Sequence, residues 1–133
     1  MSILQWNEKY SVGVGAMDDQ HRILISILNE LHEAMTLTHD AQAGERLLDK
    51  LLNYTSHHFN REEELMEASA FPGAAQHRLH HANMRQNVKD LMTRRGDPAL
   101  NIDLMFFLRD WLKSHLLVED KAYGPWLNQK GIQ

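Results

Sequence analysis

Four stretches of this sequence repeat large side chains at steps of three and four residues, the spacing that places them on one face of an α-helix. The first stretch contains His21, Leu24, Leu28, Leu31 and Met35. The second contains Leu47, Leu51, Tyr54, His58, Glu62 and Leu65. The third contains His77, His81, Met84, Val88 and Leu91, and the fourth contains Leu104, Leu108, Trp111 and His115. Each stretch therefore predicts a helix that packs one face against a partner.

Residues that end helices separate the four stretches. The segment 38–44 breaks the period, and Pro72 and Pro98 lie in the two later connections, where proline cannot continue a helix. Asp18 and Asp19 are N-cap candidates for the first helix. The expected helices are residues 18–37, residues 42–67, the stretch between Gly73 and Arg95, and residues 99–118.

Four helices of roughly 20 residues with short connections favour an all-α fold, an antiparallel up-down-up-down four-helix bundle. A chain of 133 residues suits a single domain, spanning 1–133, with one buried core. Residues 1–17 have no helical period, so we expect an irregular N-terminal arm that packs across the domain. Residues 123–126 are expected to form a cap with a short helical tail at most.

Composition excludes several classes of protein. The absence of cysteine rules out disulfides, thiolate metal sites, iron–sulfur clusters and cysteine nucleophiles. A formal net charge of −4 argues against a nucleic-acid or anionic-membrane partner. Residues 1–8 show neither the basic start nor the apolar run of a signal peptide, and no stretch approaches about 18 consecutive apolar residues. These observations predict a cytoplasmic protein, and the low charge favours a monomer.

Histidine is in excess, with nine copies in the chain. Five of them and two carboxylates form one candidate cluster, composed of His21, His58, Glu62, His77, His81, His115 and Asp120. All members except Asp120 lie on the packing stripe of their helix. In an antiparallel bundle the starts of the first and third helices lie beside the ends of the second and fourth. All seven residues are therefore expected in the same half of the bundle.

The other polar residues near these positions are expected to stay out of the cluster. They fall off the stripes or in a loop, and they are His32, His39, His57 and His80. Glu63 and Glu64 are expected to face solvent, or at most to orient a ligand histidine.

Spacing within the cluster makes two of its pairs natural chelators. His58 with Glu62, and His77 with His81, are four residues apart, which leaves both side chains on one helix face. Asp120 follows His115 by five residues, and on a regular helix this step would turn it well off the stripe. The pair can converge only if the helix ends or becomes irregular near Asp120.

Burying so many imidazoles and carboxylates together is costly unless something compensates, and metal ions would do so. Seven nitrogen and oxygen ligands exceed those of one tetrahedral zinc site and suit two borderline first-row ions. Two carboxylates would bridge the ions, with three histidines on one ion, two on the other and a solvent-derived oxygen between them. This arrangement leaves one position open, where dioxygen would bind at iron.

Four motifs lie in order along the chain: Asp18-Asp19-Gln20-His21, His58-Phe59-Asn60-Arg61-Glu62, His77 with His81, and His115 with Asp120. Together they resemble the metal-binding signatures of the hemerythrin family, in its bacterial single-domain members, and the likeness spans nearly the whole chain. By this resemblance, one iron is bound by His77, His81 and His115. The other is bound by His21 and His58. Glu62 and Asp120 bridge the two irons together with an oxo or hydroxo group.

The resemblance implies reversible dioxygen binding for carriage, storage or delivery, without catalysis, at the iron held by His21 and His58. A recipient of delivered oxygen would be an oxygen-consuming enzyme. Reversibility requires a dry pocket, because water and protons promote irreversible oxidation of the iron. We expect Trp111, Leu112 and Leu116 to wall this pocket beside His115, and Leu24 and Phe59 to wall it beside the other ligands.

Two other functions stay open from the sequence. A ferritin-like di-iron oxidase or peroxidase would also use a four-helix bundle, but such sites use the Glu-x-x-His motif twice, and this chain does not contain it. A sensor of oxygen or nitric oxide would have to pass its signal through the small surface of this domain, because no second domain or long linker is recognised in the sequence.

Overall fold

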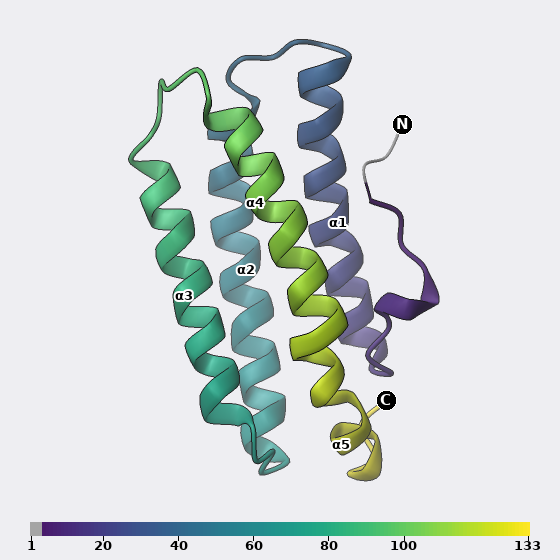
Figure 1. Ribbon diagram of the computed structural model, residues 1–133. Helices are drawn as coiled ribbons and strands as arrows, with labels where there is room; N and C mark the ends of the chain where they lie inside the picture. The colour runs from purple at the N-terminus through teal and green to yellow at the C-terminus, as the bar shows by residue number, and fades with distance from the viewer. Residues whose placement is uncertain (1–3) are drawn as a thin grey trace.

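The computed structural model describes residues 4–133, except for the side chains of residues 118 and 119. It contains four long helices, α1 (Gly15–Thr36), α2 (Ala43–Ala68), α3 (Ala74–Met92) and α4 (Leu100–Ser114). They lie side by side and run alternately in opposite directions, which confirms the predicted four-helix bundle (Figure 1). Within the described part of the chain, no helix has both the length and the apolar character needed to cross a bilayer.

The start of α1 differs from the prediction. The helix begins at Gly15, with Val14 in the N-cap position, so the assignment of Asp18 or Asp19 as N-cap is wrong. The carboxylate of Asp18 instead accepts hydrogen bonds from the Val12 N–H at 2.9 Å and from the Ser11 hydroxyl at 2.6 Å. Asp18 therefore binds the N-terminal arm to the first turn of the helix.

The end of the fourth helix is irregular. The regular part of α4 stops at Ser114, before the expected residue 118, and is followed by a π-helical turn, His115–Glu119. A 3-10 turn, Asp120–Ala122, and a short helix, α5 (Gly124–Gln129), complete the chain. The expected irregularity near Asp120 and the short helical tail are both confirmed.

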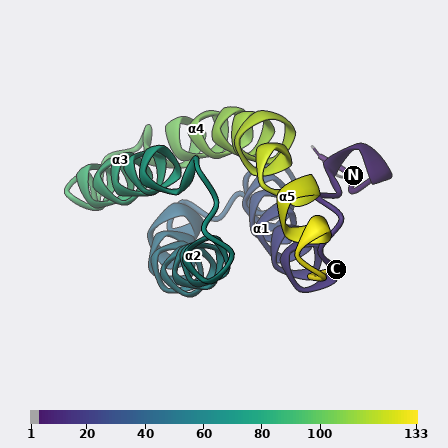
Figure 2. The same cartoon turned by 90° about the horizontal axis from the view of Figure 1, so that it is seen from below.

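Apolar side chains form two separate clusters. The larger one fills most of the bundle between the four helices. The smaller one, called here the basal cluster, consists of Val12, Val14, Met17, Met66, Tyr123 and Leu127. It lies where the N-terminal arm, the end of α2 and α5 meet, and the view along the bundle shows α5 beside the start of α1 (Figure 2). The basal cluster therefore closes one end of the bundle.

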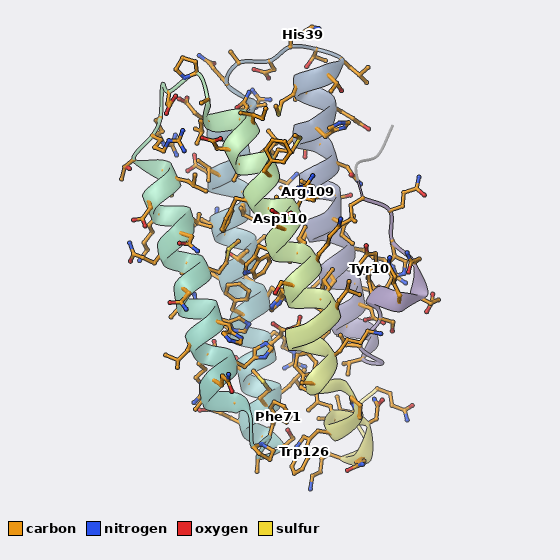
Figure 3. All side chains as sticks on the ribbon, viewed as in Figure 1. Tyr10, His39, Phe71, Arg109, Asp110 and Trp126 are labelled. Atoms are coloured by element: carbon orange, nitrogen blue, oxygen red, sulfur yellow. The ribbon has the colours of Figure 1, made fainter. Side chains whose placement is uncertain are left out.

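Aromatic residues extend this closure to the surface. Phe71 and Trp126 lie together at the lower end of the bundle, with ring centroids 6.1 Å apart (Figure 3). Both side chains are partly buried and pack against the basal cluster. His39 lies at the opposite end of the bundle, in the connection between α1 and α2 (Figure 3).

Candidate metal centre

The seven residues of the predicted cluster converge in the bundle interior. Each of them is at most 4% exposed. Their ligand atoms form two groups, each with all its atoms within 4.8 Å of one another. The first group is His21, His58, Glu62, His115 and Asp120, and the second is Glu62, His77, His81, His115 and Asp120. Because Glu62, His115 and Asp120 belong to both, the two groups are adjacent and share their carboxylates.

The two carboxylates contact imidazoles from both groups. Oε1 of Glu62 lies 3.2 Å from Nε2 of His58 and 3.1 Å from Nε2 of His81. Asp120 uses its two oxygens separately, with Oδ2 at 2.7 Å from Nε2 of His21 and Oδ1 at 2.9 Å from Nε2 of His77. This position between the groups is the one that a bridging carboxylate occupies.

The donor atoms are incompletely satisfied by the protein itself. Within the described residues, no hydrogen bond is made by five buried atoms: Glu62 Oε1, both carboxylate oxygens of Asp120, and Nε2 of His77 and of His81. Some of these atoms lie at ion-pair distance from one another, but the angles between the donor and acceptor groups are unsuitable for a hydrogen bond. Unpaired polar atoms at such depth are costly. A set of nitrogen and oxygen donors left in this state fits first-row metal ions such as iron.

The pKa shifts divide four of the histidines into two pairs, His21 with His77, which lie nearest Asp120, and His58 with His81, which lie nearest Glu62. Burial lowers the pKa of His77, but Asp120 and Glu62 outweigh this effect and raise the pKa to about 9. The same two carboxylates raise the pKa of His21 against the effect of burial. For His58 and His81, burial prevails and lowers the pKa. In the metal-free protein, a proton on His77 therefore compensates part of the carboxylate charge at neutral pH.

The carboxylates themselves stay ionised. Burial and the charge of Glu62 raise the pKa of Asp120, but His115 and His21 outweigh them and lower it to about 2. Burial likewise raises the pKa of Glu62, while the surrounding imidazoles hold it well below its usual value. Two buried anionic groups are therefore available to a cation at neutral pH.

A second layer of polar contacts holds the cluster in place. Gln20 Oε1 accepts a hydrogen bond from Nδ1 of His58 at 2.7 Å. The Tyr123 hydroxyl donates to Oε2 of Glu62. The sequence predicted a supporting role for neither residue, although Gln20 directly precedes His21 and Tyr123 follows Asp120 by less than one helical turn. Oε1 of Glu63 lies 3.7 Å from Nδ1 of His81, which agrees with the orienting role considered for this residue.

Aromatic rings cover one side of the cluster. Trp111 stacks on His115 with ring centroids 4.4 Å apart, and Phe59 stacks on His81 at 3.9 Å. The ring of Phe59 also lies 5.8 Å from that of His58, on the expected two-histidine side, but its stacking partner is His81 on the three-histidine side. The other predicted wall residues, Leu24, Leu112 and Leu116, are fully buried. All five belong to or pack against the larger apolar cluster.

The other histidines lie outside the cluster, as expected. His57 and His39 are exposed, and His32 and His80 are half-buried. Neither group of candidate ligands in the described part of the chain includes any of them. The choice of His58 over His57, and of His81 over His80, therefore agrees with the direction in which the helices present these side chains.

Comparisons with known proteins agree with this geometry. Residues 12–127 match the family model described as hemerythrin HHE cation binding domain. A bacteriohemerythrin of Stenotrophomonas maltophilia is 35% identical over 125 residues, which cover 93% of this chain and 81% of that protein. A bacteriohemerythrin of Methylococcus capsulatus is 31% identical over 131 residues, covering 96% and 99%. A crystal structure of wild-type hemerythrin, 31% identical, aligns with a TM-score of 0.84 over 95% of this chain and 98% of that one.

Proposed function

This chain belongs to the hemerythrin family, and we propose that it binds dioxygen reversibly at a centre of two non-haem iron ions. The observation that carries the proposal is the pair of overlapping ligand groups, which share two anionic carboxylates in the interior of the bundle. One metal ion would use only one of these groups. Two ions account for both.

Each ligand has a role in the proposed centre. We assign His77, His81 and His115 to one iron, and His21 and His58 to the other. Glu62 and Asp120 would hold both irons, because each carboxylate belongs to both groups of candidate ligands, and an oxo or hydroxo group would complete the centre. When bound, the iron pair supplies the electrons that dioxygen takes up and returns.

The protein's own contribution is to hold the ligands and exclude water. The larger apolar cluster lies on one side of the ligands and the basal cluster on the other. Trp111 and Phe59 cover two of the imidazole faces. Restricted access of water and protons favours release of unchanged dioxygen over irreversible oxidation of the iron. Leu24, Leu112 and Leu116 complete the apolar surroundings in this proposal.

Several wider features accompany the proposal. We infer a single domain over residues 1–133, a monomer, a cytoplasmic location and a carrier, storage or delivery role without catalytic turnover. An oxygen-consuming enzyme would receive the delivered dioxygen. The sequence reasoning above supports these features, and two relatives of this chain are named bacteriohemerythrins.

A reversible oxygen titration tests the function. The protein is loaded with iron, its iron content is measured, and it is reduced under anaerobic conditions before air is admitted. We expect two irons per chain and a visible absorption band that appears with oxygen and disappears under inert gas. Iron at one ion per chain or fewer would refute the di-iron centre. A band that does not reverse, or steady oxygen consumption with a reductant, would instead identify an oxidase.

A further inference from the structure

Gln20 is attached to α2 at two points, immediately beside a proposed ligand. Its side-chain oxygen accepts a hydrogen bond from Nδ1 of His58 at 2.7 Å. Its main-chain oxygen accepts a second one from the Tyr54 hydroxyl at 3.0 Å. Tyr54 and His58 are four residues apart on α2 and so share one face of the helix. Burial and the charge of Asp19 raise the pKa of Tyr54 to about 12, so its hydroxyl remains a donor.

The bond from His58 fixes the position of the imidazole proton. Nε2 of His58 points into the cluster, 3.0 Å from Nε2 of His21 and 3.2 Å from Glu62. An imidazole nitrogen that binds a metal carries no proton, so the proton must then be on Nδ1. The Gln20 oxygen is placed to accept that proton. The contact therefore selects the tautomer that a metal requires and holds the ring in its direction.

His21, the other histidine assigned to this iron, has no comparable support. Its Nδ1 is buried, and within the described residues it makes no hydrogen bond. Of the two imidazoles on this side of the centre, only that of His58 is thus oriented by a side-chain acceptor. Loss of that acceptor would leave both rings without one.

We propose that Gln20 is a positioning residue that sets how tightly the iron on His21 and His58 is held, and that it acts through Nδ1 of His58. This inference rests on the proposed di-iron function. Gln20 belongs to neither group of candidate ligands in the described residues, so it would act on the iron only through His58. Because its amide is a neutral acceptor, it leaves the imidazole less electron-rich than a carboxylate would. The residue at position 20 therefore also influences the reduction potential of the loaded centre.

Release of ferrous iron to a chelator tests the proposal in the full-length, iron-loaded protein under anaerobic conditions. Gln20→Met removes the acceptor and keeps the size of the side chain. We expect about tenfold faster release of one of the two irons, at the low end of the usual effect of losing such a contact, and unchanged release of the other. Gln20→Glu restores an acceptor and should restore slow release, with a lower reduction potential than that of the unaltered protein. Tyr54→Phe, which leaves the His58 bond in place, should have a smaller effect.

Gln86→Met is the matched control, because Gln86 is exposed on α3 and its side-chain amide donates a hydrogen bond to the carboxylate of Asp90. It should release iron at the unaltered rate. The thermal midpoint of each metal-free variant is measured as well, since a purely structural role would lower that midpoint without separating the two irons. Equal acceleration of both irons, or no difference between Gln20→Met and Gln86→Met, would overturn the proposal while leaving the di-iron function intact. An unaltered protein that binds no iron would overturn both.

Discussion

Two segments supply the carboxylates of the centre, and they do so by different means. α2 carries His58 and Glu62 four residues apart on one face of a regular helix. The segment after α4 carries His115 and Asp120 five residues apart, in a π-helical turn that the Asp120 N–H closes by bonding to the His115 carbonyl. Such turns are rare and are often found at functional sites. The regular segment needs only its own helix, whereas the irregular one needs support from elsewhere.

That support comes from the basal cluster. Tyr123 and Leu127 anchor the chain beyond Asp120 in this cluster, together with Val12 and Val14 of the arm. The Asn128 amide donates to the main-chain oxygen of Gly13 at 2.9 Å. The position of Asp120 is thus determined by residues from both ends of the chain. A ligand set by a regular helix should tolerate changes far away in the sequence, and a ligand set by tertiary contacts should not.

The largest expected effect comes from removing the irregular segment's carboxylate. Asp120 contacts His21 and His77, which belong to different irons in the proposed centre. Asp120→Ala should therefore reduce the iron content to less than one ion per chain, because both irons lose a ligand. Iron content is measured after loading and removal of excess metal. Asp110→Ala, at an exposed position on α4 (Figure 3), should retain two irons. Equal iron contents in the two variants would show that Asp120 does not bridge.

A smaller loss of iron is expected from a change on α2, where a shift of one residue along the helix changes the direction in which a side chain points. His58→Ala should reduce the iron content from two ions to about one, because the three-histidine iron keeps its imidazoles. His57→Ala should leave the iron content unchanged, since a step of one residue turns the side chain by about 100° and His57 is exposed. Loss of iron in both variants would contradict the assignment of His58, and not His57, as the ligand on α2.

Substitution of a glycine can test whether the position of Asp120 depends on contacts with the N-terminal arm. A Cβ added at Gly124 would overlap the main-chain oxygen of Val12, whereas one added at Gly15 would have open space. Gly124→Ala should lower the free energy of unfolding by about 1–3 kcal/mol, and it should speed the loss of iron by displacing the segment that holds Asp120. Gly15→Ala should be neutral or stabilise by up to about 1 kcal/mol. Urea titration of both variants provides the comparison, and identical midpoints would mean that the basal cluster does not support the irregular segment.

The same contrast explains how much the sequence predicts. The steps of three and four residues locate four helices and, through His58, Glu62, His77 and His81, the direction of four ligands, because direction in a regular helix depends only on spacing. The five-residue step to Asp120 indicates an irregularity but not its type. A π-helical turn is selected by tertiary contacts, and spacing alone does not encode them.

Contacts between different segments of the chain were also beyond prediction. Asp18 has the features of an N-cap, yet the arm places the Val12 N–H and the Ser11 hydroxyl against its carboxylate. Phe59 follows His58 in sequence but stacks on His81 of α3. Gln20 and Tyr123 contact His58 and Glu62 only because α1, α2 and the C-terminal segment pack together. Each case depends on how neighbouring helices are positioned, which spacing along one helix does not determine.

The smallest expected effect concerns protons in the metal-free protein, and it again separates the two segments. His77, which contacts Asp120, has a pKa raised from 6.5 to about 9, whereas burial lowers the pKa of His58 although the neighbouring Glu62 acts to raise it. A pKa raised by folding contributes stability that is complete below pH 6.5 and is lost as the pH rises through about 9. The metal-free protein should therefore become less stable over that range. Urea titrations at several pH values measure the loss, and NMR titration assigns it to an imidazole. Asp120→Asn should return the pKa of His77 toward its ordinary value and weaken the dependence of stability on pH. If His58 instead gains its proton at a higher pH than His77, the assignment of the raised pKa to His77 is wrong.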